Sequence, residues 1–157
     1  MGLFDPNDKW DEVAAKEIDR PIQIVHDQLA ESNQRYHEER PGVFRCNGIT
    51  RGAGFAEALV VVNVAEGTAS VDINTHLRTD PNARDTTRRF IAMLNESYIV
   101  PGFRLDDMCV VHFTPPDANI LAGDDVDDLV GKGFSSVHGD SHKFTALAAG
   151  SDPWTLL

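Results

Sequence analysis

The sequence predicts one α+β domain in which an antiparallel sheet of about five strands packs against helices. The chain has 157 residues, which is the size of a single domain. Apolar residues alternate with polar ones from Ala69 to Arg78, which is the period of a strand. Strand-like segments come in consecutive groups, which favours antiparallel pairing. We expect the order helix, three strands, helix, two strands, helix. Residues 1–157 form this domain, with a helical extension at residues 1–20 and an apolar tail at residues 151–157.

The N-terminal part of the chain carries a helical pattern. Its first apolar face consists of Trp10, Val13, Ala14 and Ile18. Pro21 interrupts this pattern and is well placed to open a second helix. The second apolar face consists of Ile22, Val25, Leu29 and Tyr36. We expect this helix to run through Tyr36 and to end within residues 38–42.

Three strands follow, at residues 43–50, 58–64 and 69–78. The second contains three consecutive valines and is expected to be central, and the turn Glu66-Gly67 should join it to the third as a hairpin. Asp80-Pro81 then combines a helix-capping acid with proline at the first helical position. The apolar face of the helix that it opens consists of Ala83, Thr87, Phe90, Ile91, Leu94 and Tyr98.

The C-terminal part should hold two short strands and a long helix. The strands are expected at residues 103–105 and 108–113, on either side of Asp106-Asp107, after Pro101-Gly102 has stopped the preceding helix. The stripe of the last helix consists of Val126, Val130, Phe134, Val137, Phe144 and Ala148. Gly131, Gly133 and Gly139 weaken this helix but allow another backbone to approach closely.

Charge and composition exclude several classes of function. The net charge of −11 repels phosphate backbones and anionic membrane surfaces, so neither nucleic acid nor membrane is an expected partner. The longest apolar run, residues 58–62, is too short to cross a bilayer. Cys46 and Cys109 lie in expected strands as small apolar residues, and no signal peptide is seen. We therefore expect a cytoplasmic protein without a cofactor.

Two groups of residues are candidate metal ligands. His138 and His142 are four residues apart and share a face of the last helix, a spacing that zinc sites use, but Gly139 stands where the zinc-protease pattern has its glutamate. The acidic group consists of Asp124, Asp125, Asp127 and Asp128. It could bind a hard cation, but favourable charge at a helix N-terminus explains it better, and no EF-hand spacing is present.

The sequence gives little support for nucleotide binding or for nucleophilic catalysis. Residues 52–57 resemble a dinucleotide loop, yet Glu57 stands at the third glycine position and a strand is expected next. Cys109 lies three residues before His112, so in a strand the two side chains point to opposite faces. A pair formed by Cys46 and His112 across the sheet stays open as an alternative.

The stretch from Arg88 to Asn95, followed by Pro101 to Asp107, resembles the YbjN family. Members of that family carry a helix ending in a leucine-asparagine step, then a strand that opens glycine-x-phenylalanine or similar and turns on acidic residues. An apolar helix follows, as residues 126–148 do here, and the element order matches over residues 20–150. The turn at Asp106-Asp107 lacks the expected glycine, and the helix around Trp10 has no counterpart in the family.

The resemblance implies a fold similar to type III secretion chaperones, often dimeric, with no accepted catalytic residues to carry over. Our first hypothesis is therefore a non-enzymatic protein-binding or chaperone-like domain that is a homodimer. Trp10 near one end, and Trp154 and Leu156 at the other, are candidate partner-binding residues, although both ends could simply be loosely packed. The alternative is a small-molecule- or metal-binding protein with enzyme activity.

Overall fold

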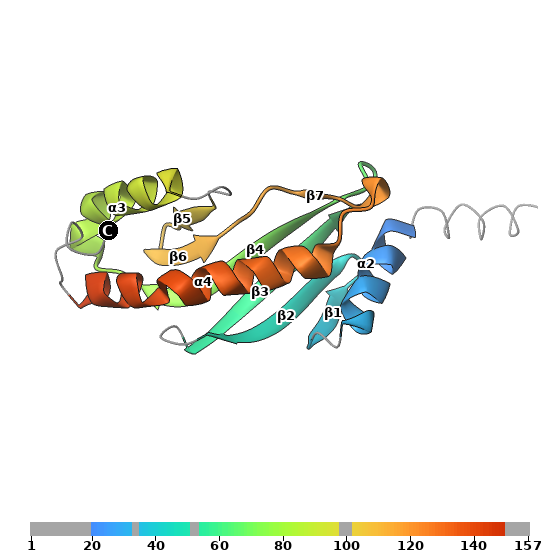
Figure 1. Ribbon diagram of the computed structural model, residues 1–157, viewed down its shortest axis with the longest axis horizontal. Coiled ribbons are helices and arrows are strands. Elements are labelled where there is room, and N and C mark those ends of the chain that lie inside the picture. Colours follow the sequence, from blue (N-terminus) through green and yellow to red (C-terminus); the bar gives the residue numbers. More distant parts are fainter. Residues whose placement is uncertain (1–19, 33–34, 51–53, 98–101, 150–157) are drawn as a thin grey trace, which may run out of the picture.

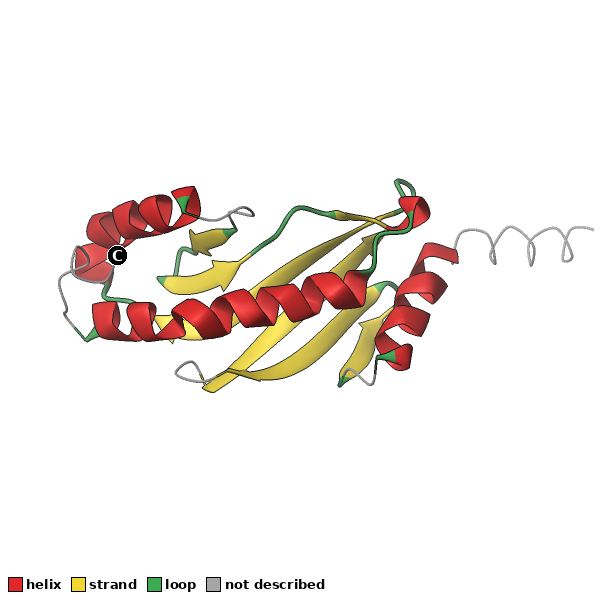
Figure 2. Cartoon of the chain, viewed as in Figure 1, coloured by secondary structure: helices red, strands yellow, loops and turns green. Residues whose placement is uncertain are grey.

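The protein is built on a seven-stranded antiparallel sheet with helices packed on one face (Figures 1 and 2). The computed structural model describes residues 20–32, 35–50, 54–97 and 102–149. The strands are β1 (Tyr36–Arg40), β2 (Val43–Thr50), β3 (Gly54–Asn63), β4 (Thr68–Arg78), β5 (Phe103–Leu105), β6 (Val110–Phe113) and β7 (Ala118–Asn119). The helices are α2 (Arg20–Glu31), α3 (Arg84–Glu96) and α4 (Val126–Ala148), with the short 3-10 helices η1 (Pro81–Ala83) and η2 (Ile120–Ala122). The predicted α+β class and the order of the main elements are confirmed.

The long strand β4 divides its side chains between two environments. The strands run β1-β2-β3-β4-β6-β5 across the sheet, and β7 pairs with the start of β4. The predicted hairpin joins β3 to β4 through a turn in which Gly67 has a φ of 67°. Along β4, Val71 and Ile73 are buried under the helices, whereas Asp72 and Asn74 point to the opposite face. This alternation creates one apolar and one polar face.

Helices α2, α3 and α4 share a single core with the apolar face. Figure 1 shows α4 crossing the sheet, with α2 near its N-terminal end and α3 at the opposite end, beside β5. A cluster of aromatic rings joins α3, β5, β6 and α4, with ring centroids 4.9 to 5.7 Å apart; its members are Phe90, Phe103, Phe113 and Phe144. The cluster fixes the inner side of the short β5–β6 hairpin, whose outer side carries the polar site described below.

One of the glycines of α4 serves the close approach that the sequence predicts. A Cβ atom on Gly133 would lie 2.9 Å from Cγ1 of Ile73 on β4, which is closer than packed carbon atoms tolerate. A Cβ atom on Gly131 or Gly139 would meet nothing within 4 Å. Gly133 therefore lets α4 lie directly on the sheet, and the other two glycines are not needed for this contact.

The prediction of a helix through Tyr36 is wrong. Helix α2 ends at Glu31, and Tyr36 begins β1, which pairs with β2 through the turn at Pro41-Gly42. Gly42 has a φ of 81°, which suits such a reversal. Tyr36 follows Leu29 by seven residues, so it matches the helical face equally well, yet its ring packs against His26 and Phe44 from the edge strand. The spacing alone could not distinguish the two structures.

Two smaller boundaries also differ from the prediction. Strand β6 begins at Val110, because Met108 and Cys109 belong to the turn that joins it to β5. Strand β3 begins at Gly54, four residues earlier than expected, and extends the pairing with β2. Among the described residues, no helix is both long enough and apolar enough to span a membrane.

Candidate functional site

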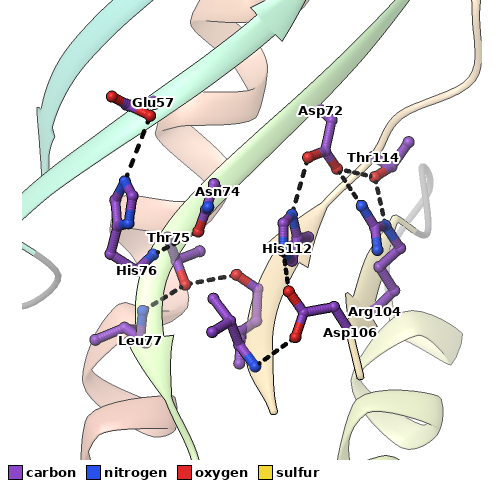
Figure 3. Close-up of polar contacts among 12 residues, drawn as sticks. Glu57, Asp72, Asn74, Thr75, His76, Leu77, Arg104, Asp106, His112 and Thr114 are labelled. Carbon is purple, nitrogen blue, oxygen red and sulfur yellow. Dashed lines mark hydrogen bonds and ion pairs between the residues drawn. The ribbon is translucent and has the colours of Figure 1, made fainter. Parts of the chain in front are cut away.

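The charged side chains of the sheet form two networks on the face opposite the helices. Figure 3 shows the first network and, from the second, Glu57 and His76. Strand register brings the first network together: Asn74 of β4 lies opposite His112 of β6, which lies opposite Arg104 of β5. Asp72, two residues before Asn74, points to the same face. In Figure 3 helix α4 lies behind these strands, on the side away from the first network.

The centre of the first network is His112, which lies between two carboxylates. Its Nδ1 is 2.8 Å from Oδ2 of Asp72, and its Nε2 is 2.8 Å from Oδ2 of Asp106. The residue is only 8% exposed. A ring nitrogen must carry a proton to donate to a carboxylate, so this arrangement suits the doubly protonated, cationic imidazole.

The pKa values of these groups follow from their contacts. The hydrogen bond to Asp72 raises the pKa of His112 above 6.5, and the bond to Asp106 adds to this against the opposing effect of burial. Burial would raise the pKa of Asp72, but hydrogen bonds from His112, Thr114 and Arg104 outweigh it and lower the pKa to about 2. Near neutral pH, Asp72 is therefore ionised and His112 favours its charged form.

Further donors hold Asp72. Its Oδ1 accepts from Oγ1 of Thr114 at 2.6 Å and from Nη2 of Arg104 at 2.8 Å, while Nε of Arg104 donates to the same threonine oxygen at 3.0 Å. Two carboxylates, one guanidinium and one imidazolium make the network neutral as a set. Removal of one partner would leave a partly buried charge without compensation, which is destabilising.

Asp106 connects this network to the turn between β5 and β6. Its Oδ1 accepts from the backbone N–H groups of Met108 and Val110, both at 2.9 Å, while Oδ2 contacts His112. At the end of this turn Cys109 has a φ of 61°, in the left-handed region that favours glycine. Cys109, two residues after Asp107, thus adopts a conformation that usually requires glycine.

The side chain of Cys109 is buried and contacts Arg84, at the start of α3. The Sγ atom lies 3.1 Å from Nη2 and 3.3 Å from Nε of the guanidinium, which also donates to the carbonyl of Asp107. The hydrogen bond to Cys109 raises the pKa of Arg84. Sequence reasoning missed this contact, because the two residues are far apart in the chain and form no motif.

The second network lies toward the edge strand β1. Arg45 on β2 donates to Glu39 and, at 2.9 Å, to Glu57 on β3, and His76 lies 3.7 Å from Glu57. These side chains are 23 to 47% exposed, whereas His112 is nearly buried. Exposed ion pairs contribute about 0–1 kcal/mol. The feature that distinguishes the first network is the nearly buried imidazole at its centre.

Chemically, the His112 network is arranged to hold strands together. A general base needs a free ring nitrogen within reach of a substrate proton. Both nitrogens of His112 face carboxylates, so the histidine cannot accept a proton in this arrangement. The contacts instead join β4, β5, β6 and the turn at Asp106, across a pairing of β4 with β6 whose register shifts between Asn74 and Arg78.

The alternative of a Cys46–His112 pair is wrong. Cys46 faces the helices and is fully buried, and burial raises the pKa of its thiol to about 12. His112 lies on the opposite face, and β3 and β4 stand between their strands. The expectation for Cys109 is also corrected: it precedes β6 in the turn rather than lying within a strand.

The acidic group at α4 has the structural role that the sequence favours. Asp125 accepts from the backbone N–H groups of Asp127 and Asp128, as a helix cap does, and Asp128 pairs with Lys132 at 2.8 Å. The fourth member, Asp124, accepts from the N–H of Asn119. All four aspartates are therefore accounted for by helix capping and local contacts, or by the favourable charge of the first turn.

The predicted histidine pair lies exposed on α4. His138 and His142 are one helical turn apart, as expected. Within the described ranges, no group of three or more His, Cys, Asp or Glu side chains is arranged to hold a metal ion. Trp10, Trp154 and Leu156, the candidate partner-binding residues, lie outside the described residues.

The sequence and the fold were compared with known proteins. The chain matches no protein-family model, and no similar protein was found among curated proteins or solved structures.

Proposed function

We propose that this chain is a non-enzymatic protein-binding domain that receives its partner on the sheet face opposite the helices. The single observation that carries the proposal is the composition of this face. Leu59 of β3 lies between Arg45 of β2 and Asp72 of β4, one from each charged network, and Val61, which is 38% exposed, lies two residues further toward the end of β3. Exposed apolar side chains bordered by polar ones are common in protein interfaces.

The partner that this face suits best is a second copy of the chain. Both charge signs are present on it, with Arg45 and Arg104 beside Glu57 and Asp72. In a two-fold dimer the same surface meets itself, so positive groups of one copy can face negative groups of the other. A chaperone-like role in a cytoplasmic homodimer, as the resemblance to the YbjN family implies, belongs to the same proposal.

The test is the molar mass of the full chain, measured by light scattering from micromolar to near-millimolar concentration. We expect a dimer for the wild type and a monomer for Val61→Glu, because a buried, unpaired carboxylate opposes association. Leu121→Glu is the matched control, since Leu121 is 61% exposed on η2, and it should remain dimeric. A wild-type protein that stays monomeric throughout this range, or a Val61→Glu variant that still dimerises, contradicts the proposal.

The second candidate function, metal or small-molecule binding, rests on the exposed pair His138 and His142 of α4. Two imidazoles one turn apart can chelate zinc, with water or another chain completing the coordination. Zinc should then raise the melting temperature of the wild type but not of His142→Ala. No shift in the wild type removes this candidate.

A further inference from the structure

The turn formed by Asp106, Asp107, Met108 and Cys109 is closed by hydrogen bonds to the oxygens of Asp106 and is tied to the rest of the protein at three places. Arg84, at the start of α3, donates to the carbonyl of Asp107 and contacts Sγ of Cys109. On the side of the core, the N–H and the hydroxyl of Thr79 donate to the carbonyl of Cys109. On the opposite face, the contact between Asp106 and His112 ties the start of the turn to the sheet. The left-handed conformation of Cys109 costs on the order of 1 kcal/mol, so the closed turn depends on these contacts.

The contact between His112 and Asp106 depends on the second proton of the imidazole. The charged groups that face His112 are Asp72 from β4, Arg104 from β5 and Asp106 from the turn. The two aspartates stay ionised near neutral pH because their pKa values are lowered, and the guanidinium stays charged. Loss of a proton from the imidazole is therefore the change that a modest rise in pH produces.

A neutral imidazole keeps one N–H, so it cannot donate a hydrogen bond to both carboxylates. The N–H is best retained on Nδ1, because Arg104 and Thr114 hold the Asp72 carboxylate in place to accept it. The lone pair of Nε2 then faces Oδ2 of Asp106, which was 2.8 Å away. Two acceptors at hydrogen-bond distance repel, and the start of the turn loses its anchor.

We propose that protonated His112 holds the turn between β5 and β6 closed. Loss of its proton then opens the turn and exposes the side chain of Cys109. The inference does not require a partner, although the network lies on the same face of the sheet as the proposed interface. Its direction follows from linkage: the folded state binds this proton more tightly than the unfolded chain does. The stabilisation is thus complete below pH 6.5 and is lost as pH rises through the raised pKa of His112.

Amide hydrogen exchange of the full chain measures the opening directly. The reporters are the backbone amides of Met108, Cys109 and Val110, which all donate to oxygens of Asp106. After correction for the intrinsic rate, we expect their protection to fall on the order of tenfold or more between about pH 6 and about pH 9, because a charged hydrogen bond is lost. Amides in the hydrogen-bonded ladder between β2 and β3 should show no such fall in protection.

Three variants test whether His112 causes this fall in amide protection with pH. His112→Gln should remove it, since glutamine does not titrate. Asp106→Asn should also remove it while the amide oxygen still accepts from the turn N–H groups. His37→Gln is the control, because His37 is an exposed histidine of β1, and it should keep the fall in protection.

Labelling by iodoacetamide, followed by mass spectrometry, provides a second measurement. Cys109 should gain labelling across the same pH range beyond the increase of a free cysteine, and this excess should be absent in Asp106→Asn. Cys46, buried in the core, should remain unlabelled.

Two results would overturn the proposal. One is amide protection of the wild-type turn that does not change with pH, and the other is a fall in protection that persists in His112→Gln. If that variant does not fold, nuclear magnetic resonance titration of the wild-type ring decides. A His112 titration at or below pH 6.5 contradicts the proposal, and a higher value supports it.

Discussion

The two faces of the sheet are stabilised by different physics, although they share the same strands. On the covered face, aromatic rings from α3, α4, β5 and β6 interlock and leave almost no exposed surface. On the opposite face, charged side chains from β4, its neighbouring strands and the turn at Asp106 form networks that water partly reaches. The stability of the covered face depends on how fully side-chain volume fills the core. The stability of the opposite face depends on protonation and on each charged group keeping all of its partners.

This difference predicts which perturbations each face resists. A change in pH should act on the His112 network and leave the aromatic cluster unchanged. A loss of side-chain volume should act on the cluster and have little effect on the charged networks. Substitutions on each face, combined with measurements at different pH, test this separation.

Phe144→Ala should lower the free energy of unfolding by about 3–5 kcal/mol, because it removes a fully buried ring and leaves a cavity among its neighbours. Denaturant unfolding followed by circular dichroism measures the change. The loss should be the same at pH 6 and pH 9, since no titrating group is involved. Leu121→Ala, at an exposed position, should change stability by no more than about 0.5 kcal/mol. A clear pH dependence of the Phe144 effect would show that the two faces are coupled.

Asp72→Asn should cost about 2 kcal/mol at neutral pH, because His112 and Arg104 lose their shared carboxylate. The folded-state pKa of Asp72 is lowered from 3.8 to about 2, so its contribution is present above pH 3.8 and is lost as pH falls toward 2. The difference between variant and wild type should therefore vanish in strong acid. Glu57→Gln, in the network that has no buried histidine, should cost about 1 kcal/mol or less. Equal costs for the two variants would contradict the ranking of the networks.

Gly133→Ala and Gly131→Ala should have effects of opposite sign. The first places a Cβ atom 2.9 Å from Ile73 and should destabilise the protein by about 1–3 kcal/mol through overpacking. The second adds a Cβ atom where nothing lies within 4 Å, and should stabilise α4 by up to about 1 kcal/mol. Thermal unfolding of the two variants side by side checks the prediction. Two stabilised variants would mean that α4 does not rest on β4 as closely as described.

The predictions made from the sequence succeeded where the signal was local. The alternation along β4, the cap at Asp80 and the stripe of α4 each follow from side-chain period or capping chemistry within a short segment. The prediction for Tyr36 failed because a five-residue edge strand is too short to show a period, and one aromatic residue fits either pattern. The acidic residues near Asp125 were explained correctly, since helix capping is also local.

The sequence by itself determined an acidic α+β domain with its strands in consecutive groups, because composition and periodicity are properties of neighbouring residues. Only the tertiary structure decided that His112 sits between Asp72 and Asp106, that Arg84 reaches Cys109, and that Cys46 lies on the other face. Asp72 and His112 are 40 residues apart, and strand order and register bring them together. Register depends on the whole pattern of strand pairing, and no motif within one segment encodes it.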